Sequence, residues 1–192
     1  MMPLHRYSRR KKVQLFFSAL SPSPSDSLLD IGGSIGMTGE FSKLYGFFNN
    51  VSTLNLEPEP IGSGHATFIQ GDACQMPFPS NSFDYVFSNA VIEHVGDFER
   101  QRRMANEVTR VARKGFFITT PNRRFPIDPH SYLPFYHLLS LSTRRRLAEG
   151  LLKGYLGEHE QYWMLSAHQM RELFPSATIV SGATISAFQR KL

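Results

Sequence analysis

Short hydrophobic runs alternate with segments of helical periodicity along most of the chain. The runs are bounded by turn-forming residues and have the length and composition of buried strands. The pattern predicts strands at 28–31, 52–57, 67–70, 83–88 and 116–120, and helices at 13–20, 38–48, 98–113, 143–155 and 166–173. Gly115 is expected to end the helix before the last of these strands. Such alternation is typical of a parallel sheet with helices on both faces, so we predict a doubly wound α/β fold.

The first predicted helix has a clear apolar stripe. Basic residues precede it, so the segment 5–20 also has some likeness to a secretory signal. Gln14 and Ser18 interrupt its apolar run, and we therefore favour a helix that covers the sheet. The stripe consists of Val13, Phe16, Phe17 and Leu20.

The segment 121–160 differs in composition from the rest, being rich in aromatic residues, proline, histidine and arginine. We interpret it as a lid over the substrate site, inserted in a single domain that spans residues 1–192. Its helix at 143–155 is expected to turn its leucines inward and its arginines to the solvent. The leucines are Leu147, Leu151 and Leu152, and the arginines are Arg144, Arg145 and Arg146.

Composition narrows the range of functions. The chain has 192 residues, 41% of them hydrophobic, and its longest apolar run is far below the roughly 20 residues of a membrane span. Cys74 is the single cysteine, which excludes a disulfide framework and a thiolate zinc site, and a cytoplasmic protein is expected. The net charge of +5 alone is weak evidence for nucleic-acid binding, because no DNA- or RNA-binding motif accompanies it.

A glycine-rich loop follows the first predicted strand, in the segment 28–36. Glycines allow a tight turn and close approach of a ligand, and the helix that follows offers backbone N–H groups to an anion. The dinucleotide fingerprint would need glycine at positions 34 and 37, where the chain has Ser34 and Met37. A dinucleotide is therefore disfavoured, and a simple tight turn remains an alternative.

Polar residues recur where the predicted strands end. Asp30 and Glu57 end the first two strands, and Asp72 and Asn89 follow the next two. In open α/β sheets these ends form the ligand-binding edge. Such acceptors suit a ligand with a diol, an exocyclic amine and an ammonium group. An adenosine that carries an amino-acid tail fits this description.

These motifs resemble the class I S-adenosylmethionine-dependent methyltransferases, within them the type 11 group, from about residue 13 to 180. The stretches 84–94 and 110–121 are similar to the fourth and fifth motifs of that family. The resemblance implies the strand order 3-2-1-4-5-7-6. Its closing pair, 177–180 and 184–188, would be trimmed or joined by a tight turn at Ser181–Gly182.

The resemblance also implies S-adenosylmethionine as cofactor and assigns its binding residues. The loop from Asp30 to Gly36 would hold the methionine tail, Glu57 the ribose hydroxyls, and Asp72 the adenine amine. Ser34 departs from the family's second glycine, and Gly33 occupies a variable position. The full set implied is Asp30, Gly32, Gly33, Ser34, Gly36, Glu57, Pro58, Asp72, Ala73 and Asn89.

Two histidines are candidate catalytic bases for the methyl acceptor. His94 follows the fourth strand, and His130 lies in the predicted lid. Each could instead pack structurally. A metal site of Asp128, His130 and His137 is possible by residue type, but the sequence predicts none. Lid aromatics that could wall an acceptor pocket are Phe125, Tyr132, Phe135, Tyr136 and Trp163.

The acceptor implied by the resemblance is a small molecule. The apolar lid and its basic helix allow a lipid or quinone taken from a membrane surface, with peripheral membrane contact. An alternative is a catalytically inactive domain that binds the cofactor and serves as a regulatory or interaction partner. A nucleic-acid methyltransferase is disfavoured, because 89–92 lacks the Asn/Asp-Pro-Pro-aromatic tetrad of such enzymes.

Overall fold

Seven strands form one sheet in the order β3-β2-β1-β4-β5-β7-β6, as predicted. The computed structural model describes residues 3–33, 39–58, 66–153 and 162–191. The first five strands are parallel, and β7 runs antiparallel to both β5 and β6. The strands are β1 (Ser27–Ile31), β2 (Asn50–Asn55), β3 (Ala66–Gln70), β4 (Phe83–Asn89), β5 (Ala112–Pro121), β6 (Thr178–Ser181) and β7 (Thr184–Arg190).

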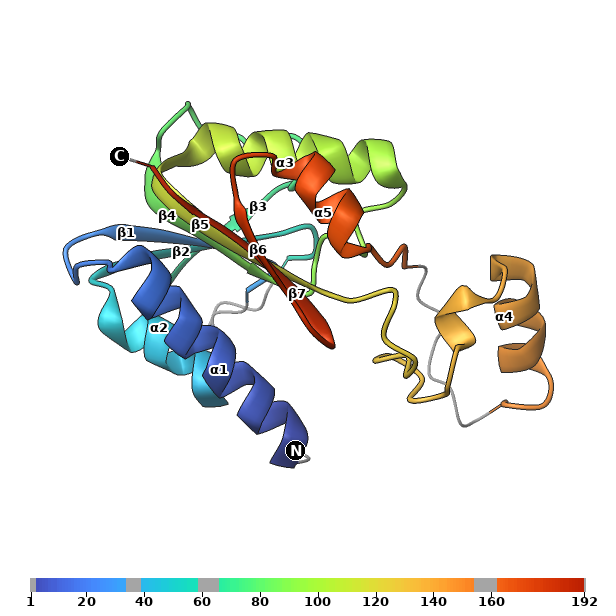
Figure 1. Cartoon of the computed structure of the whole chain (residues 1–192). Coiled ribbons are helices and arrows are strands. Elements are labelled where there is room, and N and C mark those ends of the chain that lie inside the picture. Colours follow the sequence, from blue (N-terminus) through green and yellow to red (C-terminus); the bar gives the residue numbers. More distant parts are fainter. Residues whose placement is uncertain (1–2, 34–38, 59–65, 154–161, 192) are drawn as a thin grey trace.

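Helices cover both faces of this sheet (Figure 1). The helices α1 and α2 lie on one face, and α3 and α5 on the other, which confirms the doubly wound α/β prediction. Within the described residues, no helix is both long and apolar enough to span a membrane. The helices are α1 (Pro3–Leu20), η1 (Gly39–Phe41), α2 (Ser42–Phe47), α3 (Phe98–Val111), η2 (Tyr136–Leu138), α4 (Leu141–Glu149) and α5 (Ala167–Leu173).

Phe16 is the centre of the core beneath α1. Its side chain is fully buried, as are those of Leu20 and Leu28. The Phe16 ring makes edge-on contacts with five aromatic rings at centroid distances of 5.5–6.2 Å. This confirms that the first helix covers the sheet. The five partners are Phe17, Phe48, Tyr85, Phe87 and Phe117.

Gly115 does not end α3, so that prediction is wrong. The helix ends at Val111, β5 begins at Ala112, and Gly115 lies within the strand opposite Arg190. A Cβ at Gly115 would overlap the backbone carbonyl of Gln189 and lie 3.3 Å from the Leu20 side chain. Glycine is needed here because β7 and α1 both approach the strand closely.

The predicted orientation of the lid helix is wrong for Arg144 and Leu151 and correct for Arg145 and Arg146, which are exposed. The helix α4 ends at Glu149, Leu151 is 87% exposed, and Arg144 is only 5% exposed. The guanidinium of Arg144 lies 4.5 Å above the ring of Tyr162, and the Tyr136 hydroxyl donates to the Arg144 carbonyl. Figure 1 shows α4 away from the sheet, so its inner side meets aromatic residues of the lid instead of the aliphatic core.

A buried carboxylate joins the amino-terminal ends of β1 and β4. Asp84 accepts hydrogen bonds from the backbone N–H of Ser27 at 3.0 Å and from Arg113 at 2.7 Å, and Lys114 lies 3.2 Å away. Burial alone would raise the pKa of Asp84. The hydrogen bond from Ser27 and the charges of Arg113 and Lys114 outweigh it and lower the pKa to about 2.

We expect Asp84→Asn to destabilise the protein by roughly 2 kcal/mol at pH 7, because the charged form of Asp84 is favoured in the folded state. A lowered folded-state pKa gives stability that is present above the unfolded value of 3.8 and is lost as the pH falls towards 2. Urea unfolding of both proteins between pH 7 and pH 2.5 measures this, with Glu172→Gln in an exposed ion pair as control. A difference that does not shrink on acidification would contradict the assignment.

Candidate cofactor and acceptor site

The carboxyl ends of the parallel strands bring the predicted site residues to one edge of the sheet. β1 pairs with β2 on one side and β4 on the other, and β3 pairs with β2. Asp30 lies in β1, Glu57 and Asp72 each lie two residues beyond a strand, and Asn89 ends β4. The predicted residues that the structure describes are therefore positioned as the ligand-binding edge of an open α/β sheet.

The turn after β1 needs glycine at both described positions. Gly32 has a φ of 74°, and its N–H donates to the Leu54 carbonyl at 2.8 Å. A Cβ at Gly32 would overlap Val91, and a Cβ at Gly33 would overlap Asp30 and Tyr45. The turn thus follows a tight path between side chains. Ser34 and Gly36, the other two predicted loop residues, lie outside the described residues.

Asp30 lies beneath this turn. It is 2% exposed, and its Oδ2 accepts a hydrogen bond of 2.8 Å from the Tyr45 hydroxyl of α2. Burial raises the pKa of Asp30 to about 7, although the bond from Tyr45 acts in the opposite direction. Asp30 therefore connects the turn to α2. Tyr45 was not predicted as a site residue, because an aromatic residue in an amphipathic helix is expected to pack in the core and does not indicate a binding site.

Glu57 and Pro58 lie beyond β2 and are both exposed. β2 ends at Asn55, so Glu57 is not within the strand as predicted but follows it. Its carboxylate has no hydrogen-bond or ion-pair partner among the residues that the structure describes. Within the described part of the chain both oxygens are open to a ligand, and a carboxylate can accept from a pair of vicinal hydroxyls.

Asp72 lies in a turn that follows β3. Its two carboxylate oxygens accept hydrogen bonds from the Cys74 N–H at 2.8 Å and from the Arg100 guanidinium at 2.9 Å. Burial acts to raise the pKa of Asp72, but these two bonds lower it overall. The carboxylate is charged and fixed, with Ala73 buried beside it. Burial raises the pKa of the Cys74 thiol to about 11, so this residue packs in the core and is not activated as a nucleophile.

Asn89 accepts a hydrogen bond from a lysine, Lys12, that was not predicted as a site residue. Its Oδ1 accepts hydrogen bonds of 2.8 Å from the Lys12 ammonium and from the Thr119 hydroxyl. Burial lowers the pKa of Lys12 to about 8, and the charge of Arg9 contributes, whereas Glu93 acts to raise it. Lys12 belongs to α1, so only the packing of that helix on the sheet brings it to this edge. Because Lys12 is one of several basic residues in the segment 6–12, the sequence gives no reason to select it as a site residue.

Glu93 is fully buried in the loop between β4 and α3. Its Oε2 accepts a hydrogen bond of 2.9 Å from the Thr120 hydroxyl, while Oε1 has no partner among the described residues. Burial raises the pKa of Glu93 to about 7 against the effects of Thr120 and Lys12. A buried carboxylate with an unsatisfied oxygen is costly, and such groups concentrate at functional sites.

The structure brings together the two predicted histidines. The rings of His94 and His130 lie edge to face with centroids 5.0 Å apart, and His130 stacks on Tyr162 at 4.2 Å. Tyr162 donates to Asp128 at 2.6 Å, and the other Asp128 oxygen accepts from the His130 N–H. Tyr162, like Tyr45 and Lys12, is therefore a residue of this site that the sequence did not predict.

Asp128 and His137 do not form the alternative metal site that the sequence allowed. His137 Nδ1 lies 3.6 Å from Asp128, and its Nε2 lies 2.9 Å from the Arg123 carbonyl. His130 meets Asp128 through its backbone N–H and not through its ring. These contacts stabilise the conformation of the lid. The aromatic residues of the lid differ in exposure. Tyr136 is buried, whereas Phe125, Tyr132 and Phe135 are 40–58% exposed.

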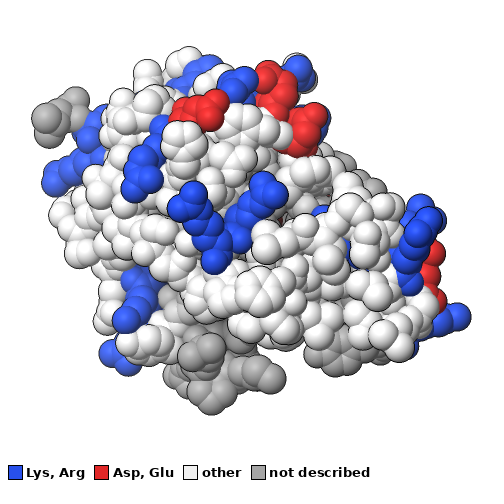
Figure 2. Space-filling view, turned by 45° about the vertical axis from the view of Figure 1, so that its right-hand side comes forward, with Lys and Arg blue, Asp and Glu red and all other residues white. Residues whose placement is uncertain are grey.

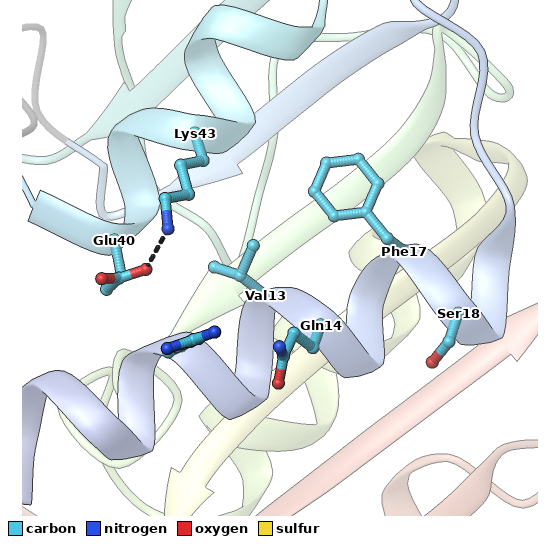
Figure 3. Close-up of a pocket in the computed structure, with 7 residues that line it drawn as sticks. Val13, Gln14, Phe17, Ser18, Glu40 and Lys43 are labelled. Carbon is cyan, nitrogen blue, oxygen red and sulfur yellow. Dashed lines mark hydrogen bonds and ion pairs between the residues drawn. The ribbon is translucent and has the colours of Figure 1, made fainter.

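Two open cavities lie away from the strand-end residues. One of about 560 Å³ separates α1 from η1 and α2, where Figure 3 shows Lys43 bonded to Glu40 beside Val13 and Phe17. The other, of about 390 Å³, lies between the lid and α5 and is lined in part by Arg124 and Phe135. Neither contains the four polar residues of the strand ends, so neither is the predicted cofactor site.

Sequence comparison supports the family suggested by the motifs. Residues 29–119 match the family model described as a methyltransferase domain. A demethylmenaquinone methyltransferase from Anoxybacillus flavithermus is 30% identical over 112 residues, which cover 56% of this chain and 45% of that protein. The chain thus matches less than half the length of this curated relative.

Solved structures share the fold at low identity. An N-methyltransferase, NodS from Bradyrhizobium japonicum, has a TM-score of 0.63 and 15% identity over 98% of this chain and 88% of that one. Magnesium protoporphyrin IX methyltransferase from Synechocystis has a TM-score of 0.61 and 14% identity over 98% and 84%. The solved structures share the fold, and the match of residues 29–119 to the methyltransferase domain, together with the strand order, supports the class I S-adenosylmethionine-dependent methyltransferases of the type 11 group as the family of this chain.

Proposed function

We propose that this chain binds S-adenosylmethionine at the carboxyl edge of β1–β4 and transfers its methyl group to a small-molecule acceptor. The observation that carries the proposal is the exposed carboxylate of Glu57, which has no partner among the described residues and lies at the same sheet edge as the tight turn at Gly32–Gly33. Both features suit a ligand with a diol and an amino-acid tail. The relatives and solved structures that the chain resembles are methyltransferases.

The described residues fit the cofactor in distinct ways. Glu57 would accept from the ribose hydroxyls, and the turn at Gly32 and Gly33 would let the backbone approach the methionine tail. Asp72, held by Arg100, would accept from the adenine amine, with Ala73 packed beside the ring. Asn89 would act through its amide nitrogen, because its oxygen already accepts from Lys12 and Thr119.

The cofactor supplies an electrophilic methyl group that an acceptor displaces in line, so the protein must align the reacting atoms and exclude water. His94 and His130 lie where the lid meets the loop after β4. We infer that they face the acceptor and assist its deprotonation. His130 stacks on Tyr162 and His94 contacts the same ring edge-on, and these contacts orient the two imidazoles.

Within this proposal, a quinone-type acceptor is the specific candidate. The relative at 30% identity is named for demethylmenaquinone. Because the methyl group is an electrophile, the acceptor must be electron-rich, and we expect the reduced quinol to react in preference to the quinone. Such acceptors are apolar and dissolve in membranes.

The surface of the lid favours an apolar acceptor. Of the large hydrophobic side chains that are exposed in the described chain, most lie between residues 125 and 151. Figure 2 shows a broad uncharged surface on this side of the molecule, with arginine and lysine side chains near its borders and acidic side chains among them at the upper and right-hand edges. Apolar residues flanked by cations suit an anionic membrane surface. The exposed lid residues are Phe125, Ile127, Tyr132, Phe135, Leu138, Leu139, Leu141 and Leu151.

We expect Glu57→Ala to weaken binding of S-adenosylmethionine and S-adenosylhomocysteine by about 10- to 100-fold, as loss of hydrogen bonds to a charged group should. Isothermal titration calorimetry measures both affinities. Glu57 is exposed, so the variant should fold normally, and Glu149→Gln on α4 is a matched control. Unchanged affinity would remove Glu57 from the site, and absence of binding by the unmodified protein would favour the inactive-domain alternative.

We expect His94→Gln and His130→Gln each to lower kcat by about 100-fold or more for a hydroxyl-bearing acceptor, because a positioned base is lost. Cofactor affinity should stay within about twofold. Formation of S-adenosylhomocysteine with a reduced naphthoquinone acceptor provides the assay, and His168→Gln, on the exposed side of α5, is the control. Equal rates in variant and parent would assign the two histidines a structural role.

We expect the double variant Leu138→Ser/Leu151→Ser to bind anionic phospholipid vesicles at least about tenfold more weakly, since two apolar side chains no longer enter the interface. Vesicle co-sedimentation measures this. Val180→Ser on β6, also exposed, is the control and should bind like the parent. Equal sedimentation of the double variant would contradict membrane contact through the lid.

A further inference from the structure

Three side chains with metal-binding donor atoms meet where the lid contacts the sheet. One carboxylate oxygen of Glu93 and one ring nitrogen each of His94 and His130 lie within 4.8 Å of one another. Glu93 and His94 belong to the loop after β4, whereas His130 comes from the lid. Among the residues that the structure describes, this is the one cluster of three such groups that could hold an ion.

Glu93 supplies an independent reason to expect a cation. Its side chain is 0% exposed, Oε2 accepts from Thr120, and Oε1 has no partner in the described part of the chain. Lys12 influences Glu93 through its charge, but its ammonium donates to Asn89. An ionised carboxylate in this position is stabilised if a cation binds to the second oxygen.

Hydrogen bonds and ring contacts hold the cluster in place. The Trp163 N–H donates to the Glu93 carbonyl at 2.7 Å, and the Gln101 side chain donates to the Trp163 carbonyl at 2.8 Å. His130 stacks on Tyr162, and its N–H donates to Asp128. Such supporting contacts are typical of metal sites, because they orient the ligands.

We propose that Glu93, His94 and His130 form a binding site for a divalent transition-metal ion. Two imidazoles and one carboxylate suit Zn²⁺, Co²⁺ or Fe²⁺ better than Mg²⁺ or Ca²⁺, which prefer oxygen ligands. An ion bonded at about 2.1 Å holds its ligands roughly 3–4 Å apart, so rotations of the side chains from the 4.8 Å limit would complete the set. His130 is exposed, so the ion can enter from the solvent.

This ion would join the lid to the β4–α3 loop and leave positions open for other ligands. With the ion bound, His94 and His130 act as ligands and not as free bases. Metal binding and cofactor binding involve different residues, so the failure of either leaves the other testable, and the base role proposed above for His94 and His130 belongs to the metal-free protein.

The test uses the full chain without an affinity tag, dialysed against EDTA and then against buffer. We expect Co²⁺ to bind in one equivalent with visible absorption bands, and Zn²⁺ to compete with it and to raise Tm. Glu93→Gln keeps an acceptor for Thr120, and His130→Ala changes an exposed residue. Each should lower Co²⁺ affinity at least tenfold, whereas His168→Ala on α5 should not.

Circular dichroism and cofactor titration on the same variants establish that they are folded. Lack of stoichiometric Co²⁺ and Zn²⁺ binding by the unmodified protein would overturn the site. Equal affinity in Glu93→Gln, His130→Ala and the control would overturn the assignment of ligands. Loss of metal binding with retained cofactor binding supports the proposal.

Discussion

The position of β1 between β2 and β4, parallel to both, is the constraint on which the rest of the structure depends. Because all three strands run in one direction, their carboxyl ends open onto the same edge. Residues that are far apart in sequence, such as Asp30 and Asn89, therefore reach one region because β1 and β4 pair side by side. The tight turn after β1 follows from the same arrangement, since Val91 and Tyr45 leave space only for glycine.

The lid is held to this edge mainly by polar and aromatic contacts. Trp163 bonds to the backbone of Glu93, Tyr162 stacks on His130, and Arg144 lies over Tyr162. Few aliphatic residues contribute, and several leucines of the lid are exposed. Such contacts depend on the orientation of the groups, which suits the role of a lid that we propose for this segment.

Hydrophobic periodicity was sufficient to predict the sheet and the helices on both of its faces. The order of the strands was predicted from the family resemblance. It failed where neighbours decide the outcome. Arg144 is buried because aromatic rings receive its guanidinium, and Gly115 is a strand residue because β7 passes close to it. Neither neighbour is visible in the local pattern.

The candidate site residues that the sequence predicted differ from the unpredicted ones for the same reason. Asp30, Glu57, Asp72 and Asn89 are positioned by strand ends, which local sequence marks. Lys12, Arg100 and Tyr162 come from elements whose approach depends on packing across the whole domain. Their polar or aromatic character alone gives no indication of the residues that they meet.

The environment of Phe16 has a consequence for the size of the independent folding unit. The segment that carries the family signature begins at residue 29, yet Phe48, Tyr85, Phe87 and Phe117 all pack on a ring that lies before it. A fragment cut at the signature would expose this aromatic surface to water and would tend to aggregate. The independent folding unit is therefore expected to extend beyond the recognisable motif and to include α1.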